Sequence, residues 1–150
     1  MRRFIAKFVF GALLATAGIS GAIAAEHQIQ MLDTGPDGSI MVFDPPYLKI
    51  DKGDTVTFVA KDPGHNVISG YVPDGSRTWK GTVSHSLSVK LDTEGVYIYE
   101  CDLHNPLGMV GVIQVGNPVN LDAARQAAAN ISKRMAMGGD RLQSYLDKVH

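Results

Sequence analysis

The amino-acid sequence predicts a mainly β protein: an eight-stranded Greek-key β-sandwich followed by two C-terminal α-helices. Three observations support this prediction. Several short segments alternate polar and apolar residues with a period of two, which is typical of half-buried strands. Turn signals made of Gly, Pro and Asp separate these segments, and after Gly116 the apolar residues recur at helical spacing instead.

Six segments carry the strand pattern. Residues 54–60 (DTVTFVA) are the clearest, because Val56 and Phe58 fall on one face of a strand. The others are residues 28–32, 47–50, 86–91, 96–101 and 109–115. A further short strand begins at His65. Strands at this spacing, with loops between them, favour a sandwich of about eight strands.

Two apolar stripes predict the helices. They are Leu121, Ala124, Ala128 and Ile131 in the first helix and Leu142, Tyr145, Leu146 and Val149 in the second. Asn120 is expected to cap the first helix, Gly138-Gly139 to end it, and Asp140 to cap the second. Amphipathic helices normally face a core, so we expect both to pack on one face of the sandwich.

The N-terminus has the features of a secretory signal peptide. Arg2, Arg3 and Lys7 precede an apolar run over residues 8–23, and the small residues at 22–24 suit signal peptidase, which would cut after the last of them. A membrane anchor is the alternative, but it would need roughly 20 strongly apolar residues, and glycines break this run. The paired arginines leave the general secretory and twin-arginine export routes open.

Cleavage there would leave a sandwich over residues 25–117 and a helical extension over residues 118–150, in a protein located in the periplasm. The mature chain would hold 11 Lys and Arg against 15 Asp and Glu, a net charge of −4 with His neutral. This balance argues against a nucleic-acid-binding protein, which would need a basic face. With the signal removed, no membrane association is expected.

One segment supplies three metal-binding side chains within nine residues: Cys101, His104 and Met109. It separates two predicted strands, so it forms a loop at one end of the sandwich. His65 can reach the same end, because strands distant in sequence become neighbours in a Greek key. Two imidazoles, one thiolate and a weak axial thioether are the ligands of a blue-copper electron-transfer site.

Each of these residues has a simpler explanation when taken alone. Met109 would fill a gap in the core, His65 would be an ordinary hydrogen-bonded histidine, and Cys101 a buried, unreactive thiol. A zinc site would need a better fourth donor than Met. A catalytic thiol would need room for a substrate beside its base, which a Cys and a His three residues apart do not leave. The joint pattern therefore favours copper.

The sequence resembles the cupredoxins and, within them, the pseudoazurin group. The resemblance is carried by the segments MVFDPPYLKIDKGDTVTFVAKDPGHNV, YVPDG, GVYIYEC and GMVGVIQVG, by the spacing Cys-x-x-His-x4-Met, and by the two C-terminal helices. It implies the cupredoxin fold and one copper ion per chain, cycling between Cu(II) and Cu(I). The implied copper ligands are His65, Cys101, His104 and Met109.

The resemblance also assigns roles to residues around the ligands. Asn66 would tie the strand of the first ligand to the Cys loop, which fixes the ligand geometry. Met41 would lie against the exposed ring of His104, although core packing explains a methionine there equally well. The docking surface for redox partners would include Leu103, Pro106, Leu107 and Lys80.

The chain departs from the family pattern in the ligand loop. A proline and an aromatic residue usually flank the second histidine, where this chain has Leu103 and Asn105, and residues 106–108 differ as well. Glu100 stands where lysine is common. Together with Asp102, it is expected to weaken the steering of the protein toward acidic partners.

These features predict a periplasmic one-electron carrier, not an enzyme, which by family resemblance would donate electrons to a nitrite or nitrous-oxide reductase through transient contacts. Two alternatives stay open: a copper carrier or chaperone, and an electron donor to a different periplasmic redox enzyme. A copper enzyme would need a second metal site and more histidines than the sequence offers. We expect the protein to be a monomer.

Overall fold

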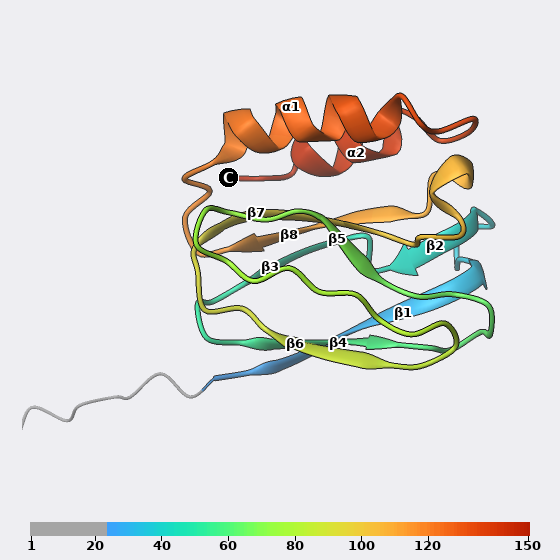
Figure 1. Cartoon of the computed structure of the whole chain (residues 1–150), viewed down its shortest axis with the longest axis horizontal. Coiled ribbons are helices and arrows are strands. Elements are labelled where there is room, and N and C mark those ends of the chain that lie inside the picture. Colours follow the sequence, from blue (N-terminus) through green and yellow to red (C-terminus); the bar gives the residue numbers. More distant parts are fainter. Residues whose placement is uncertain (1–23) are drawn as a thin grey trace, which may run out of the picture.

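Eight strands and two helices make up the part of the chain that the computed structural model describes, residues 24–150 (Figure 1). The strands are β1 (Glu26–Thr34), β2 (Ile40–Asp44), β3 (Tyr47–Ile50), β4 (Thr55–Val59), β5 (Ile68–Tyr71), β6 (Leu87–Lys90), β7 (Gly95–Glu100) and β8 (Val110–Val115). A short 3-10 helix, η1 (Asn105–Leu107), precedes β8, and α1 (Leu121–Ser132) and α2 (Arg141–Leu146) follow it. The predicted fold class is confirmed.

Two four-stranded sheets face each other. One has the order β2-β1-β4-β6 and the other the order β3-β8-β7-β5. β1 runs parallel to β4 and β3 runs parallel to β8, whereas the other neighbours are antiparallel. Because a parallel pair needs a crossover in place of a hairpin, segments far apart in the sequence meet at the ends of the sandwich.

Two of the strands, β2 and β5, show no clear alternation in the sequence. In β2, Met41 adopts a left-handed backbone conformation with a φ of 50°, and the two residues after it are both buried. In β5, the pairing with β7 shifts register between Ser69 and Tyr71, around Gly70. Irregular backbone of this kind removes the period of two on which a strand prediction depends.

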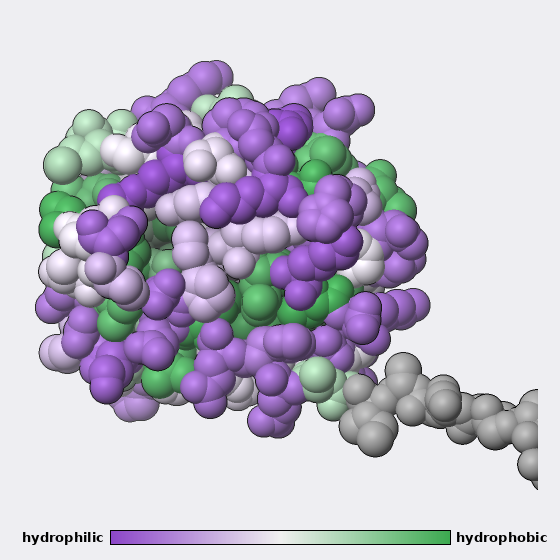
Figure 2. All heavy atoms as spheres, turned by 180° about the vertical axis from the view of Figure 1, so that it is seen from behind, coloured by the Kyte–Doolittle hydropathy of each residue, from purple (hydrophilic) through white to green (hydrophobic). Residues whose placement is uncertain are grey.

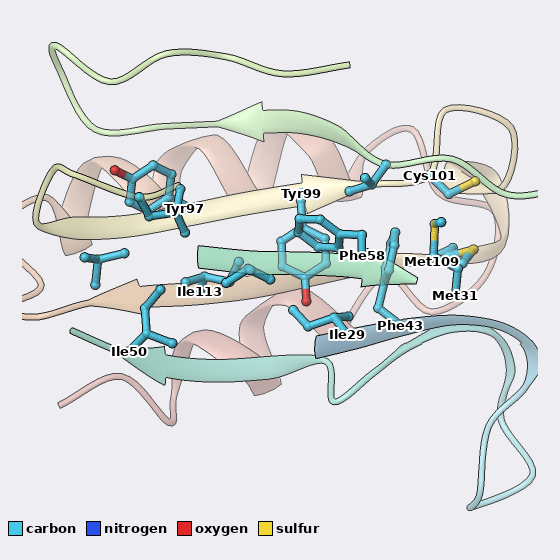
Figure 3. Close-up of a cluster of buried hydrophobic side chains, with 14 residues drawn as sticks. Ile29, Met31, Phe43, Ile50, Phe58, Tyr97, Tyr99, Cys101, Met109 and Ile113 are labelled. Carbon is cyan, nitrogen blue, oxygen red and sulfur yellow. The ribbon is translucent and has the colours of Figure 1, made fainter. Parts of the chain in front are cut away.

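The main core lies between the two sheets. Phe58 of β4 is completely buried, as the alternation in its strand predicts. Tyr99 of β7 packs edge-on against Phe43 and Phe58, with ring centroids 4.8 and 4.9 Å apart. Figure 3 shows that this cluster of apolar side chains extends along the sandwich to Cys101 and Met109 at one end. Cys101 and Met109, at the two ends of the ligand loop, therefore belong to the main core.

The helices cover the outer face of the sheet β3-β8-β7-β5, with α1 against β7 and α2 against β8 (Figure 1). All six residues of β7 and all six of β8 are buried, because one face of the sheet meets the other sheet and the second face meets the helices. This second core consists of Val96, Ile98, Val110, Val112, Ala124, Ala128, Ile131, Leu142 and Leu146. The prediction that both helices pack on one face is confirmed.

The first helix ends earlier than the sequence predicts. α1 stops at Ser132, whereas the expected end was Gly138. The intervening segment turns toward the ligand loop, where the amides of Ala136 and Met137 both donate to the carbonyl of Pro106, at 2.8 and 3.1 Å. These tertiary hydrogen bonds compete with the continuation of the helix, and no local signal in the sequence reveals them.

Asn120 and Asp140 occupy the N-cap positions of α1 and α2, as predicted, but neither side chain makes a capping hydrogen bond. The side-chain oxygen of Asn120 accepts a hydrogen bond from the amide of Val96 at 2.6 Å, and its side-chain nitrogen donates to the Val96 carbonyl at 3.0 Å. Asp140 has helical backbone angles and makes no side-chain capping bond. Asn120 therefore joins the start of α1 to β7 instead of capping the helix.

Among residues 24–150, no helix is long and apolar enough to cross a membrane. On the face that Figure 2 shows, hydrophilic side chains cover most of the surface, and apolar atoms lie in small areas between them. Apart from its last residue, the predicted signal peptide lies outside the described residues.

Candidate metal centre

Side chains from three segments meet at one end of the sandwich. His65 precedes β5, Cys101 directly follows β7, and His104 directly precedes η1. Their candidate ligand atoms all lie within 4.8 Å of one another, and this is the one such group of three or more in residues 24–150. The two histidine Nδ1 atoms are 3.0 Å apart, and Cys101 Sγ is 3.5 Å from His104 Nδ1.

The backbone of the loop between β7 and β8 holds these side chains in place. The amide of Asn105 donates to the carbonyl of Cys101 at 2.9 Å, which makes a tight turn around the second histidine. The amide of Met109 donates to the His104 carbonyl at 3.2 Å, and the Cys101 amide donates to the Met109 carbonyl at 3.0 Å. Gly108 adopts a φ of 78°, a conformation that a side chain would strain. The loop is therefore closed by its own hydrogen bonds.

Met109, the fourth predicted ligand, is completely buried. In Figure 3 its sulfur lies at the same end of the core as the sulfur of Cys101, with Met31 beside it. A thioether is a soft and weak donor, which suits a long axial contact to copper. The position of Met109 is compatible with that role, and its assignment as a ligand stays a prediction.

The exposure of the two histidines differs. His65 and Cys101 are completely buried, whereas His104 is partly exposed. Burial lowers the pKa of His104 below its ordinary value of 6.5; the neighbouring His65 lowers this pKa further, and Asp33 opposes the shift. The ring is therefore mainly neutral at pH 7, which is the form of imidazole that binds a metal.

Asn66 links the His65 loop to the Cys101 loop. Its side-chain oxygen accepts a hydrogen bond from the amide of Asp102 at 3.0 Å and lies 3.6 Å from Cys101 Sγ. Its side-chain nitrogen donates to the carbonyl of Gly81 at 3.2 Å. Since Asn66 is only 2% exposed, these bonds are shielded from water. These bonds connect the two loops, and the role of Asn66 in fixing the ligand geometry stays a prediction.

Asp33, on β1, is a residue beside the site that no motif in the sequence indicates. Its Oδ1 atom is 2.9 Å from His65 Nε2, whereas the other ring nitrogen of His65 faces His104. The two residues are 32 positions apart in the chain. Their proximity follows from the packing of the strands, so a sequence pattern could not have revealed it.

Met41 lies in β2 and is packed, partly buried, against the main core. The guanidinium of Arg141 donates to the carbonyls of Met41 and Gly108, at 3.1 and 2.8 Å, so the start of α2 connects β2 to the ligand loop. Core packing is therefore the explanation that the contacts support. A contact between the Met41 side chain and the His104 ring stays a prediction.

Glu100 is buried, which corrects the expectation that its charge weakens docking. It is 6% exposed, and Arg134 donates to both of its carboxylate oxygens at 2.9 Å. The side chain of Asn105 donates to the same carboxylate. Asn105 itself is 7% exposed. Two of the departures from the family pattern, Glu100 and Asn105, are thus bonded to each other and almost completely buried.

The residues predicted to form the docking surface surround the ligand loop. Leu103 is 56% exposed, Pro106 is exposed and Leu107 is partly exposed. The side chain of Lys80 is 72% exposed and pairs with Asp102 at 3.0 Å. An exposed pair of this kind contributes little stability, so Lys80 can readily exchange Asp102 for another anion.

Met137 belongs to the same end of the molecule and was not predicted there. Its side chain is 53% exposed, and its amide donates to the carbonyl of Pro106. It lies in the segment between α1 and α2, which packs against the ligand loop. The helical extension therefore contributes an apolar side chain to the surface beside the site.

The three converging donors fit copper. A thiolate is soft and suits Cu(I), imidazole nitrogens are acceptable to Cu(II), and no carboxylate belongs to the group. The hydrogen bonds of the loop and of Asn66 hold the segments that carry these donors. This donor set is that of an electron-transfer site.

Comparisons with known proteins agree with this chemistry. The family model described as "Copper binding proteins, plastocyanin/azurin family" matches residues 29–116. The pseudoazurin of Methylorubrum extorquens is 41% identical over 132 residues, covering 81% of this chain and 88% of the relative. The pseudoazurin of Paracoccus pantotrophus is 37% identical over 135 residues, covering 88% and 91%. The crystal structure of native pseudoazurin from Hyphomicrobium denitrificans superposes with a TM-score of 0.76 at 35% identity, covering 83% of this chain and 98% of that one.

Proposed function

Since the chain belongs to the plastocyanin/azurin family of copper-binding proteins, and within it to the pseudoazurins, we propose that it carries single electrons on one copper ion held by His65, Cys101, His104 and Met109. The observation that supports this ligand set is the convergence of Nδ1, Sγ and Nδ1 atoms within 4.8 Å. When bound, the ion supplies a one-electron couple between Cu(II) and Cu(I). Pseudoazurins are electron-transfer proteins and not enzymes.

The residues of the chain have distinct roles in this proposal. Cys101 and His65, both completely buried, hold the ion away from water. Asn66 and the hydrogen bonds of the loop keep the donor atoms in one arrangement, so that little reorganisation accompanies electron transfer. His104, whose ring is partly exposed, connects the buried site with the surface and is the proposed route of the electron.

We propose that redox partners dock on the apolar surface around this ring. Leu103, Pro106, Leu107 and Met137 form it, and Lys80 lies at its edge. Transient redox complexes need only a small contact area, which suits a few apolar side chains. By family resemblance the acceptor is a nitrite or nitrous-oxide reductase, and a different periplasmic redox enzyme is the alternative.

The proposed location is the periplasm, after removal of residues 1–24. The basic start and the apolar run of the sequence support this, as does a contact of Ala25, which directly precedes β1. The backbone nitrogen of Ala25 lies 2.8 Å from Oδ1 of the buried Asp54. Cleavage after Ala24 would convert that nitrogen into an ammonium group placed on a carboxylate. N-terminal sequencing of protein from a periplasmic extract should give Ala25 as the first residue, and an uncut chain would contradict the proposal.

Visible absorption tests the ligand set. The copper-loaded protein should absorb intensely through thiolate-to-copper charge transfer, with one copper per chain. Cys101→Ser should abolish this band because a hydroxyl cannot replace the thiolate. His85→Ala, which removes an exposed histidine outside the site, is the control and should keep it. A band that survived in Cys101→Ser would refute the assignment.

A chelator experiment separates an electron carrier from a copper chaperone. A chaperone must release its metal, whereas the buried ligands proposed here should lose copper slowly while electrons exchange fast. Rapid loss of copper to a chelator, together with slow electron exchange, would favour the chaperone.

Stopped-flow mixing of the reduced protein with candidate reductases, at several ionic strengths, tests the partner. A rate that falls with added salt would indicate an acidic partner that Lys80 and Arg134 help to attract. A rate that rises with salt would indicate that the two facing surfaces carry charge of the same sign, and attraction of the partner by Lys80 and Arg134 would then be excluded.

A further inference from the structure

The ring of His65 is held on both sides by side chains. Its Nδ1 atom faces His104 Nδ1 at 3.0 Å, and its Nε2 atom lies 2.9 Å from Oδ1 of Asp33. His65 is completely buried, whereas the Asp33 side chain is 58% exposed. The largely exposed Asp33 carboxylate therefore contacts the ring nitrogen of His65 that does not face His104.

The position of Asp33 is fixed by the sheet. It lies within β1, next to Leu32 and Thr34, both of which pair with β2. Its backbone amide donates to a carboxylate oxygen of Asp62 at 2.8 Å, which ties β1 to the loop that carries His65. The backbone of Asp33 is thus held by the sheet and by Asp62, and it presents the carboxylate to the imidazole of His65.

Two consequences follow from this geometry. An acceptor at Nε2 favours the tautomer in which Nε2 carries the proton, and this leaves the lone pair of Nδ1 directed toward Cys101 and His104. The negative charge of the Asp33 carboxylate also makes His65 a stronger electron-pair donor to a metal. It stabilises the higher charge of Cu(II) relative to that of Cu(I).

We propose that Asp33 is a positioning residue of the copper site: it orients His65 through its Nε2 hydrogen bond and lowers the reduction potential through its negative charge. This rests on the proposed function, since it concerns the same site. If this hydrogen bond served only the fold, its removal would change the stability of the protein slightly. It would leave the reduction potential unchanged.

Two substitutions separate the hydrogen bond from the charge. Asp33→Asn keeps an oxygen that can accept from Nε2 and removes the charge, whereas Asp33→Ala removes both. Asp74→Asn is the control for net charge. Asp74 is exposed and follows Pro73, which contacts Gly95 at the end of β7 opposite to Cys101.

The first readout is the reduction potential, measured by spectroelectrochemistry at neutral pH. Asp33→Asn should increase the ratio of Cu(I) to Cu(II) at a fixed external potential about tenfold, which is about 59 mV for a one-electron couple. Its affinity for Cu(II) should fall by about tenfold, and its affinity for Cu(I) should change less. If both Asp33 variants had the potential of Asp74→Asn, the proposal would be overturned.

The second readout needs no copper. In the metal-free protein, 15N NMR of His65 should find the proton on Nε2, and the Asp33→Ala variant should lose this preference. A proton on Nδ1 in the wild type would contradict the orienting role. If the wild type lacked the intense visible band, the proposed function would fail, but the tautomer would still decide whether Asp33 orients His65.

Discussion

His104 is partly exposed, whereas the other candidate ligands, His65, Cys101 and Met109, are completely buried. This difference divides the residues of the site into those that hold the metal and one that connects it with the surface. The ligand candidates are recognisable in the sequence because three of them fall within nine residues and have matching chemistry. Asp33 is not recognisable, since only the packing of β1 brings it to His65.

Met109 permits a prediction about the axial position. Met109→Leu conserves volume, so the protein should lose less than about 1.5 kcal/mol of stability. Removal of the thioether should favour Cu(I) and raise the reduction potential, whereas the harder oxygen of Met109→Gln should favour Cu(II) and lower it. Cyclic voltammetry measures both. Equal potentials in the three proteins would show that Met109 is not a ligand.

At the scale of elements, regular alternation explains which strands the sequence reveals. β4 is recognised because Val56 and Phe58 are buried, whereas Thr57 between them is only partly buried. β2 is not recognised, because a left-handed residue breaks its period, and β5 is expected only as a short strand from His65, whereas it begins at Ile68 and shifts register around Gly70. The ends of the helices are hidden for a related reason: Asn120 and the segment after α1 bond to other elements, and local capping rules do not describe such bonds.

Glu100 and Arg134 join β7 to the segment that follows α1, and this leads to a prediction. Arg134→Met should leave a buried carboxylate without its cation and cost about 1–2 kcal/mol, below the range for fully buried pairs because the Arg134 side chain is 58% exposed. The double variant with Glu100→Gln should recover most of this loss, since Asn105 keeps an acceptor. Urea unfolding measures the free energies; additive losses in the double variant would contradict the account.

Gly111 of β8 lies opposite Tyr99 of β7, and a Cβ at this position would overlap the tyrosine ring. Gly111→Ala should therefore destabilise the protein by about 1–3 kcal/mol through overpacking. Gly139→Ala is the matched control, because its Cβ would meet no atom closer than 4.0 Å, and its effect should stay within about 0.5 kcal/mol. Thermal unfolding of both variants gives the comparison, and similar losses would count against the tight packing between β7 and β8.

At the scale of the whole molecule, both ends of the described chain are tied to the sandwich. The nitrogen of Ala25 bonds to Asp54, and the carbonyl of the C-terminal His150 accepts from Gln114 on β8. The segment between the helices reaches the ligand loop, so the extension supports the site as well as covering a sheet. The apolar stripes in the sequence predict the helical extension, but they do not predict its contact with the ligand loop.

Asp54 leads to a prediction about acid stability. Hydrogen bonds from the Ala25 nitrogen and from His27 hold the pKa of Asp54 below its ordinary value of 3.8. A depressed pKa in the folded state means that Asp54 stabilises the protein above about pH 3.8 and that this contribution is lost as the pH falls through the lower, folded value. Asp54→Asn should be less stable than the wild type at pH 6, and the difference should shrink below pH 3.8. A difference independent of pH would exclude the ionic contribution.

Anomalous diffraction at the copper edge, from a crystal of the copper-loaded protein, is the most direct test of the central claim. One peak per chain is expected, within bonding distance of His65 Nδ1, Cys101 Sγ and His104 Nδ1, with the sulfur of Met109 at a longer distance. A peak at another group, or one that Cys101 does not contact, would contradict the assignment of this site as the electron-carrying centre.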